Sequence, residues 1–386
     1  MLRRLPTRPL LALLLGASAV SLVAGVRNAV GSSLDLQPYL EGARMWLRGV
    51  SPYDVDLPTG FVYLPQAALL FAPLAALPDP VARGVWAALN TLLWLGSLAL
   101  LARIFARGDR RLAWWMLAAA AGWACARVTL GNGQLGIFTV AALVAALAAG
   151  QRGRHLLAGV ALGLALTKWS LSLPFVVYFA ARGRWSTLAL AALTVAGGYL
   201  AFGLRLGQGP WAVAVDYAYV LKAHAGVKHA FFRTSELTAA GTAVASLWGE
   251  LAVAAVGGGA LLAAGWACRR RSGPREAALL LAICAVCSLT MLPHLHYDQV
   301  VLALAVLPLM AWPAEPLRPW ARGMALITCA LLWLDLPGSL WKFAGRPDPI
   351  AEGGIVWLAY VGFDRLWLGL LFAALMVALG PGWRDR

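Results

Sequence analysis

The chain has 386 residues, of which 61% are hydrophobic and only 13% charged. Soluble domains carry roughly 25% charged residues, so this composition excludes a soluble globular enzyme, a disordered chain and a secreted disulfide scaffold. The 32 Lys and Arg against 17 Asp and Glu give a formal charge of +15. Because the basic residues fall in short clusters between apolar segments, they indicate cytoplasmic loops of a membrane protein and not a nucleic-acid surface.

The apolar segments predict one all-α integral membrane domain over residues 1–386. A crossing takes about 20 residues, which allows roughly 10–13 transmembrane helices when short or broken ones are counted. The first follows Arg3, Arg4 and Arg8 and is interpreted as an uncleaved helix in preference to a signal peptide. Both termini are then expected in the cytoplasm. The expected full crossings are 9–30, 81–106, 112–130, 135–150, 186–204, 240–266, 277–292, 298–312, 323–338 and 356–379.

Two apolar stretches do not fit this alternation as ordinary spans. The stretch 63–78 is broken by Pro65 and Pro73, and the stretch 156–181 consists of two halves that meet at Thr167-Lys168-Trp169. Broken or re-entrant helices are tolerated in a membrane where they line a protein or water-filled cavity. We therefore expect a functional site at these two places.

Two of the expected outward segments, 31–62 and 205–236, are long and polar. Long loops in compact folds are usually functional or disordered. In the first, Leu40, Ala43 and Leu47 share one face, which predicts a short amphipathic helix at the membrane surface. Asp35 stands at its start. By its chemistry alone it is either a favourable charge at a helix N-terminus or a general base at the mouth of a cavity.

Lys168 interrupts an apolar stretch. A lysine at membrane depth costs about 2.5–3.5 kcal/mol on insertion scales, so it usually pairs with a partner or lines a pathway. The alternative is that it snorkels to the interface from a short helix.

Two polar turns lie at expected outer ends of spans. Gly131-Asn132-Gly133-Gln134 is either a plain turn or a place where Asn132 and Gln134 bind a polar ligand. The two histidines of Pro293-His294-Leu295-His296-Tyr297-Asp298 could bind a metal, move a proton or hold a phosphate, or they are ordinary loop histidines.

Together these residues resemble glycosyltransferase family 87, a group of integral-membrane GT-C enzymes. The matching positions run through about the first half of the chain: Asp35, Tyr39, Gly49-x-x-Pro52-Tyr53, Phe61-x-Tyr63-x-Pro65, Pro73, Gly133-Gln134, Gly159, Gly163, Lys168 and Arg182-Gly-Arg184-Trp185. The chain departs from the family's usual pattern at Gly136, where the family often has Asn, and at Trp169, where it often has Pro.

The resemblance implies a polytopic GT-C-type bundle that transfers a sugar, commonly mannose, from a polyprenyl-phosphate donor with inversion. The acceptor is a hydroxyl of a lipid or glycan on the outer face of the cell membrane. Asp35 is then the candidate base. The candidates that stabilise the leaving phosphate are Lys168 first, His294 or His296 second, and basic residues of 205–236, among them Lys228 and Arg233, third. Further substrate-binding candidates are Arg44, Tyr63, Asn132 and Gln134.

No metal is expected to be obligatory, because a monophosphate leaving group can depart without one, although a divalent cation remains possible. The alternative function is a polytopic transporter or a flippase for lipid-linked sugars, since transporters also use broken helices and buried charges. A two-fold internal repeat would favour that alternative.

Overall fold

The structure is a computed structural model that describes residues 7–53, 60–232, 247–271, 273–291, 296–312, 318–335 and 367–378. Within these ranges every regular element is a helix, and no strand occurs. This confirms the all-α membrane fold predicted from the composition.

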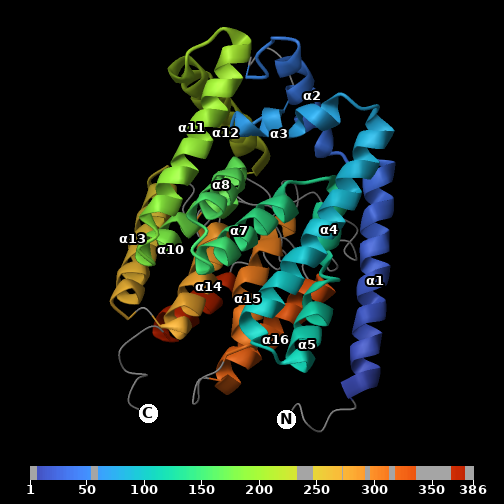
Figure 1. The fold of residues 1–386 in the computed structure, drawn as a ribbon, viewed down its shortest axis with the longest axis vertical. Coiled ribbons are helices and arrows are strands. Elements are labelled where there is room, and N and C mark those ends of the chain that lie inside the picture. Colours follow the sequence, from blue (N-terminus) through green and yellow to red (C-terminus); the bar gives the residue numbers. More distant parts are fainter. Residues whose placement is uncertain are drawn as a thin grey trace.

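Three of the predicted crossings are confirmed as long apolar helices. They are α1 (Thr7–Gly31), α4 (Asp79–Ala106) and α11 (Trp185–Leu206), with 25, 28 and 22 residues. At 1.5 Å per residue each is at least about 33 Å long, enough to span a ~30 Å hydrocarbon core. In Figure 1, α1 and α4 stand at one edge of the bundle and α11 at the opposite edge. Among the described residues, these three have the length and hydropathy of a span, or four if one bent pair counts as a span.

The expected crossing 112–130 is wrong as a continuous helix, whereas the expected crossing 135–150 is confirmed as one continuous helix. The first is split into α5 (Arg110–Ala120) and α6 (Ala124–Asn132), and the second is α7 (Gly136–Gln151). The axes of α6 and α7 meet at 112°, so this pair is a broken span or a re-entrant loop. Gly133 ends α6 with φ +72°, a left-handed conformation that glycine adopts without steric cost.

The two irregular stretches behave as predicted. Residues 156–181 form α8 (His155–Ala165), the 3₁₀ turn η1 (Leu166–Lys168), α9 (Trp169–Ser172) and α10 (Pro174–Ala181), with the break at Lys168. Residues 63–78 contain α3 (Gln66–Ala75), whose 10 residues span only about 15 Å. A helix of that length cannot cross the hydrocarbon core.

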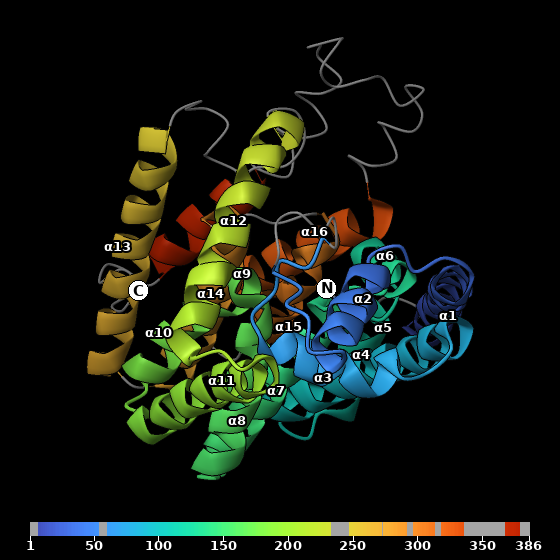
Figure 2. The same ribbon diagram turned by 90° about the horizontal axis from the view of Figure 1, so that it is seen from above.

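The predicted amphipathic helix is α2 (Leu36–Leu47), which buries Leu36, Tyr39, Leu40 and Ala43 on one face. It packs on α3, and Gly42 lets the Phe61 ring lie against the helix backbone. Figure 1 and Figure 2 show α2, α3 and α12 (Pro210–Phe232) together at one end of the bundle. These elements therefore cover the end of the bundle at which α1 ends.

The remaining helices follow in chain order. They are α12 (Pro210–Phe232), α13 (Leu247–Arg271), α14 (Pro274–Thr290), the 3₁₀ helix η2 (His296–Leu302), α15 (Ala303–Met310), α16 (Arg318–Leu334) and the helix Trp367–Ala378. Most of the segment expected as a long loop, 205–236, is thus helical in α12. The expected span 298–312 begins as a 3₁₀ helix, and the first part of the expected span 356–379 lies outside the described residues. Residues 278–289 of α14 are buried on every side, which makes it a central helix.

Candidate active site

Asp35 lies in the short turn between α1 and α2. The backbone enters this turn through Ser33, which has φ 41°, and the Ser33 hydroxyl donates back to the Ala29 carbonyl of α1. The Asp35 N–H donates to the Asn132 carbonyl at 3.0 Å. The backbone carbonyl of Asn132 therefore holds the backbone of Asp35 in place.

The loop between α6 and α7 is packed directly under this turn. A Cβ added at Gly133 would lie 2.8 Å from the Leu36 Cβ, so only glycine allows this approach. The indole N–H of Trp86, on α4, donates to the Gly133 carbonyl at 2.8 Å. Because α1, α4 and α6 all contribute, the position of Asp35 is set by three helices and not by the turn alone.

The Asp35 side chain is half-buried and occupies the N-cap position of α2. It makes no side-chain hydrogen bond to the first turn of that helix. A negative charge at a helix N-terminus is electrostatically favourable. The carboxylate oxygens are not used as a helix cap, so a bound molecule can approach them.

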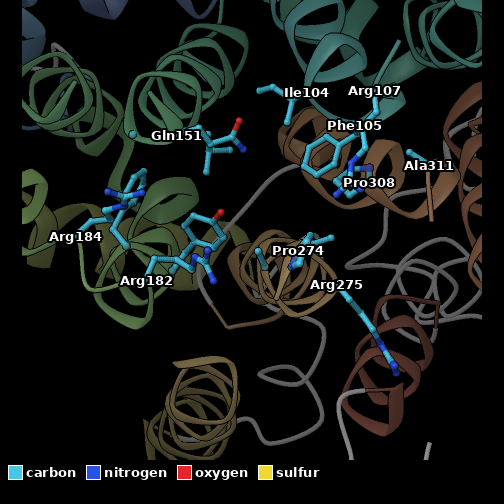
Figure 3. A pocket seen from close by; sticks show the side chains of 16 residues that line it. Ile104, Phe105, Arg107, Gln151, Arg182, Arg184, Pro274, Arg275, Pro308 and Ala311 are labelled. Carbon is cyan, nitrogen blue, oxygen red and sulfur yellow. The ribbon is translucent and has the colours of Figure 1, made fainter. Parts of the chain in front are cut away.

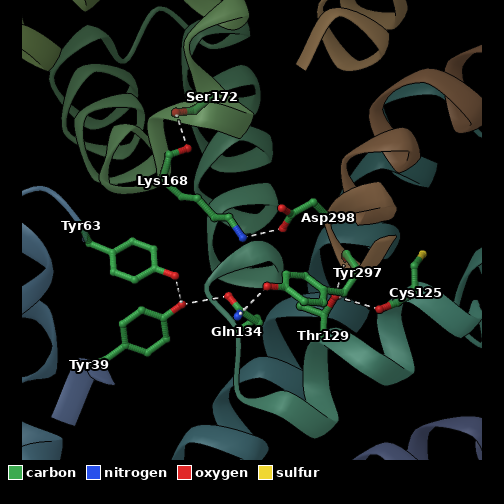
Figure 4. A network of polar contacts seen from close by, with 9 residues as sticks. All are labelled: Tyr39, Tyr63, Cys125, Thr129, Gln134, Lys168, Ser172, Tyr297 and Asp298. Carbon is green, nitrogen blue, oxygen red and sulfur yellow. Dashed lines mark hydrogen bonds and ion pairs between the residues drawn. The ribbon is translucent and has the colours of Figure 1, made fainter. Parts of the chain in front are cut away.

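A chain of polar contacts starts on α2 and leads into the bundle (Figure 4). The hydroxyls of Tyr39 and Tyr63 are hydrogen-bonded at 2.8 Å, and Tyr39 donates to the Gln134 side-chain oxygen at 2.8 Å. The Gln134 amide nitrogen donates to the Tyr297 hydroxyl at 3.0 Å. Gln134 is therefore the link between the α2 end of the site and η2.

Beyond Tyr297 lies an ion pair between Lys168 of η1 and Asp298 of η2, with side chains only 8% and 4% exposed. The Lys168 ammonium also lies 5.3 Å from the centre of the Tyr297 ring. A charge at this depth needs a partner, and Asp298 supplies one. Lys168 therefore does not snorkel to the interface.

The break in the helix is what turns Lys168 toward the site. Lys168 has φ −109° and ψ 72°, outside the helical region, and the Ser172 hydroxyl donates to its carbonyl at 3.2 Å. The Ser288 hydroxyl, on α14, donates to the Leu171 carbonyl at 2.7 Å. The Trp169 indole N–H donates to the Tyr217 hydroxyl at 3.0 Å. Carbonyls freed by the break thus find hydroxyl partners, as buried backbone groups require.

Asp298 is held against the start of α7. A Cβ at Gly136, the first residue of α7, would lie 3.6 Å from a carboxylate oxygen of Asp298 and 3.2 Å from the Thr129 methyl. The Thr129 hydroxyl lies 2.7 Å from the Tyr297 carbonyl. The positive end of the α7 dipole favours the carboxylate at this place.

The two tyrosines nearest Asp35 lie outside the helices that can span the membrane. Burial raises the pKa of Tyr39 above its ordinary value, and the neighbouring Tyr63 hydroxyl adds to the shift. Burial also raises the pKa of Tyr63, although its hydrogen bond with Tyr39 opposes the shift, and the carboxylates of Asp298 and Asp35 raise it further. Both phenols therefore keep their protons at neutral pH and serve as hydrogen-bond donors.

Residues 61–293, more than half of the chain, match the model of glycosyltransferase family 87. The chain belongs to this family. The family membership confirms the resemblance drawn from the sequence and favours a glycosyltransferase over the transporter alternative. Comparisons with curated proteins and with solved structures gave no match.

The region matched to glycosyltransferase family 87 contains Tyr63, Asn132, Gln134 and Lys168, which the structure brings to one site. Asp35 lies outside the matched region, but the bond to Asn132 attaches it to that site. The family match and the geometry thus select overlapping parts of the molecule.

Among the predicted residues whose side chains the structure describes, Arg44 is not part of this network. Arg44 pairs with Asp79 at the start of α4 and donates to the Ala75 carbonyl at 3.2 Å, so it ties α2 to α3 and α4. The backbone of His296 begins η2, and that of Lys228 lies in α12. The side chains of these two residues, and all of His294 and Arg233, lie outside the described residues.

Three members of the site were not singled out as site residues from the sequence: Tyr39, Tyr297 and Asp298. Asp298 carried a usable signal. A lysine at membrane depth requires an opposite charge, and Asp298 directly precedes a long apolar segment. Its position 130 residues after Lys168 gave no local pattern by which to choose it over other acids.

In this glycosyltransferase, no group of three or more His, Cys, Asp or Glu side chains within the described ranges has the spacing to hold a metal ion. Cys284 and Cys287, which have CxxC spacing, are buried in α14 as free thiols.

Proposed function

We propose that this glycosyltransferase transfers a sugar from a polyprenyl-phosphate donor to an acceptor hydroxyl on the outer face of the cell membrane. The sugar that we propose is mannose. The reaction inverts the anomeric carbon, and Asp35 is the general base. The acceptor is a hydroxyl of a lipid or a glycan. The observation that carries the proposal is a half-buried carboxylate, free of helix capping, that acts electrostatically on the buried Tyr39 and Tyr63, whose hydrogen-bond network leads toward a buried lysine.

The chemical step needs only a base and a leaving group. Asp35 accepts the proton of the acceptor hydroxyl while that oxygen attacks the anomeric carbon. The new bond from carbon to the acceptor oxygen forms as the bond from carbon to the phosphate oxygen breaks. The electron pair of the broken bond leaves on the polyprenyl phosphate, and attack from the opposite face inverts the configuration. The sugar gains no charge and no oxidant is needed.

Charge develops on the leaving phosphate, and fixed donors stabilise it. The Lys168 ammonium has three N–H donors, so its bond to Asp298 leaves hydrogens for a phosphate oxygen. The single proton of the Tyr63 hydroxyl is directed to Tyr39, so Tyr63 is a candidate to accept a hydrogen bond from a sugar hydroxyl. His294, His296, Lys228 and Arg233 are further cation candidates from the expected outer segments.

Purified protein reconstituted in vesicles tests the proposal. The assay follows radiolabelled mannose from polyprenyl-phosphate mannose into acceptor, with nucleotide-activated mannose as a second donor. We expect Asp35→Asn to lower the rate by about 10²-fold or more, the usual contribution of a general base. Glu41→Gln, which removes an acid of α2 whose side chain is 45% exposed, is the matched control and should keep the wild-type rate.

Full activity in folded Asp35→Asn would show that Asp35 is not the base. Transfer from nucleotide-activated mannose alone would overturn the lipid-linked donor. In sealed vesicles of known orientation, product made only when the donor is supplied on the face bearing Asp35 supports transfer on that face.

A further inference from the structure

A cavity lies at the end of α7 that is opposite to Gly136 and Asp298. It has a volume of about 380 Å³ and is enclosed by parts of α4, α7, α10, α14 and α15 (Figure 3). Gly136, at the start of α7, adjoins Asp298, whereas Gln151, at the end of α7, lines this cavity. The two sites are therefore separated by the 16 residues of α7, about 24 Å.

The lining of this cavity has one sign of charge. It includes Arg107, Arg182, Arg184 and Arg275, and none of the lining residues is Asp or Glu. In Figure 3, Arg182 and Arg184 come from one side and Arg107 from the opposite side. Arg275 extends away toward the helix Trp367–Ala378, where it donates to the Ala378 carbonyl at 3.3 Å. Arg107, Arg182 and Arg184 therefore contribute most of the positive charge that lines the cavity.

A general excess of arginine at one end of a membrane protein does not account for this arrangement. Arg152 and Arg154 lie in the turn after Gln151, and both are exposed and outside the lining. Arg182 and Arg184, by contrast, are partly buried. Arg107 is held at φ 48°, a conformation that costs a residue with a Cβ about 1–2 kcal/mol.

The rest of the lining is partly apolar. Phe105, Leu147 and Pro308 provide hydrocarbon surface, while Tyr178 and Gln151 provide hydrogen-bonding groups. The volume lies in the range of ligand pockets, which are mostly apolar with a few convergent polar groups. An anion attached to an apolar group matches both parts of the surface.

We propose that this cavity binds a phosphate group. Guanidinium groups match phosphate oxygens with paired N–H donors, and arginine is over-represented where such recognition is needed. The apolar surface fits the hydrocarbon part of a phosphorylated lipid, and the same arginines would also hold a free phosphate ion. This site is independent of the proposed sugar transfer, because it shares no residue with the Asp35 site.

Native mass spectrometry of the purified full chain tests the site. The probes are phosphatidic acid, phosphatidylcholine as a zwitterionic control, and inorganic phosphate as a competitor. The variant Arg182→Gln/Arg184→Gln removes two cations from the lining, and Arg152→Gln/Arg154→Gln removes two from an equivalent Arg-Gly-Arg turn outside it. Arg107→Gln, at an exposed position, is a further variant with little effect expected on folding.

We expect phosphatidic acid to bind in preference to phosphatidylcholine, and to bind at least about tenfold more weakly to the Arg182/Arg184 and Arg107 variants, because each lost charge-assisted bond is strong. The Arg152/Arg154 variant should bind as the wild type does. Displacement by inorganic phosphate would identify the free ion as the ligand, and resistance to displacement would identify the lipid. Equal loss in both double variants, or no preference for phosphatidic acid, would overturn the site.

Discussion

The Lys168 ammonium and the Asp298 carboxylate form a buried ion pair between segments that lie 130 residues apart in the chain. Each residue stands at a place where an α-helix is interrupted, Lys168 in η1 and Asp298 in η2. The pair therefore fixes two irregular segments against each other and closes the inner end of the polar network. Removal of one partner from such a pair typically costs about 3–5 kcal/mol, because the other charge is left buried and alone.

The first prediction separates the structural role of this pair from a catalytic role. Lys168→Met should lower the free energy of unfolding by about 3–5 kcal/mol, whereas Lys168→Met/Asp298→Leu should recover most of the loss, because no charge is then left unpaired. Thermal unfolding in detergent measures both effects. The double variant should fold and still transfer sugar slowly, because the ammonium that stabilises the leaving phosphate is gone.

The transfer assay on the folded double variant decides this point. A wild-type rate would assign the ion pair to structure alone and remove Lys168 from the mechanism. An unfolding temperature as low as that of the single variant would instead contradict the pairing.

The sequence predicted the parts of this fold that depend on local pattern. Long apolar runs predicted α1, α4 and α11, and the polar residues around Lys168 predicted the break between α8 and α10. The split between α5 and α6 was missed, because residues 120–123, Ala-Ala-Gly-Trp, fit a continuous apolar helix equally well. The polar residues of 210–232 likewise pointed to a loop, although they form α12.

For the candidate site, the sequence predicted individual residues but not the contacts between them. Asp35, Lys168 and Gln134 were found because polar residues beside apolar segments stand out in a membrane protein. The contacts between them were not predictable, since the partner of Lys168 comes from η2 and the partner of the Asp35 N–H from the end of α6. Such long-range pairs are fixed by packing and leave no spacing pattern in the chain.

A second prediction concerns metal dependence. Sugar transfer should continue at the wild-type rate after treatment with excess EDTA, because a monophosphate leaving group can be stabilised by cationic side chains alone. The measurement is the mannose transfer assay on untreated protein and on protein that has been treated with EDTA and then freed of the chelator by gel filtration. Loss of activity that added Mg²⁺ or Mn²⁺ restores would refute the prediction.

A third prediction follows from the buried tyrosines. Tyrosine in an unfolded chain titrates near pH 10, whereas the folded protein holds the Tyr63 proton to higher pH. Unfolding above about pH 10 therefore releases a proton, so this contribution to stability is complete below that pH and is lost as the pH rises. The unfolding temperature should fall between about pH 9 and pH 11.

Substitution identifies the group responsible for this pH dependence. Tyr63→Phe should make the fall in unfolding temperature shallower, because one titrating proton is absent, while Tyr39, whose pKa burial also raises, still contributes. Tyr219→Phe, at a side chain that is 65% exposed, should leave the fall unchanged. Identical pH profiles for wild type and Tyr63→Phe would show that Tyr63 is not the source.

The fourth prediction tests how the α6–α7 loop positions Asp35. Gly133→Ala places a Cβ 2.8 Å from the Leu36 Cβ and also strains the backbone at φ +72°, whereas Gly207→Ala meets the same kind of strain at φ +67° with no atom within 4 Å. The strain alone costs about 1–2 kcal/mol, so Gly207→Ala should lower the unfolding temperature only modestly. Gly133→Ala should lower it further and reduce sugar transfer by about tenfold or more, since the Asn132 carbonyl that holds Asp35 must shift, and small misplacements of catalytic groups are costly. Equal effects of the two substitutions on stability and transfer would show that the close packing of Gly133 against Leu36 does not position Asp35.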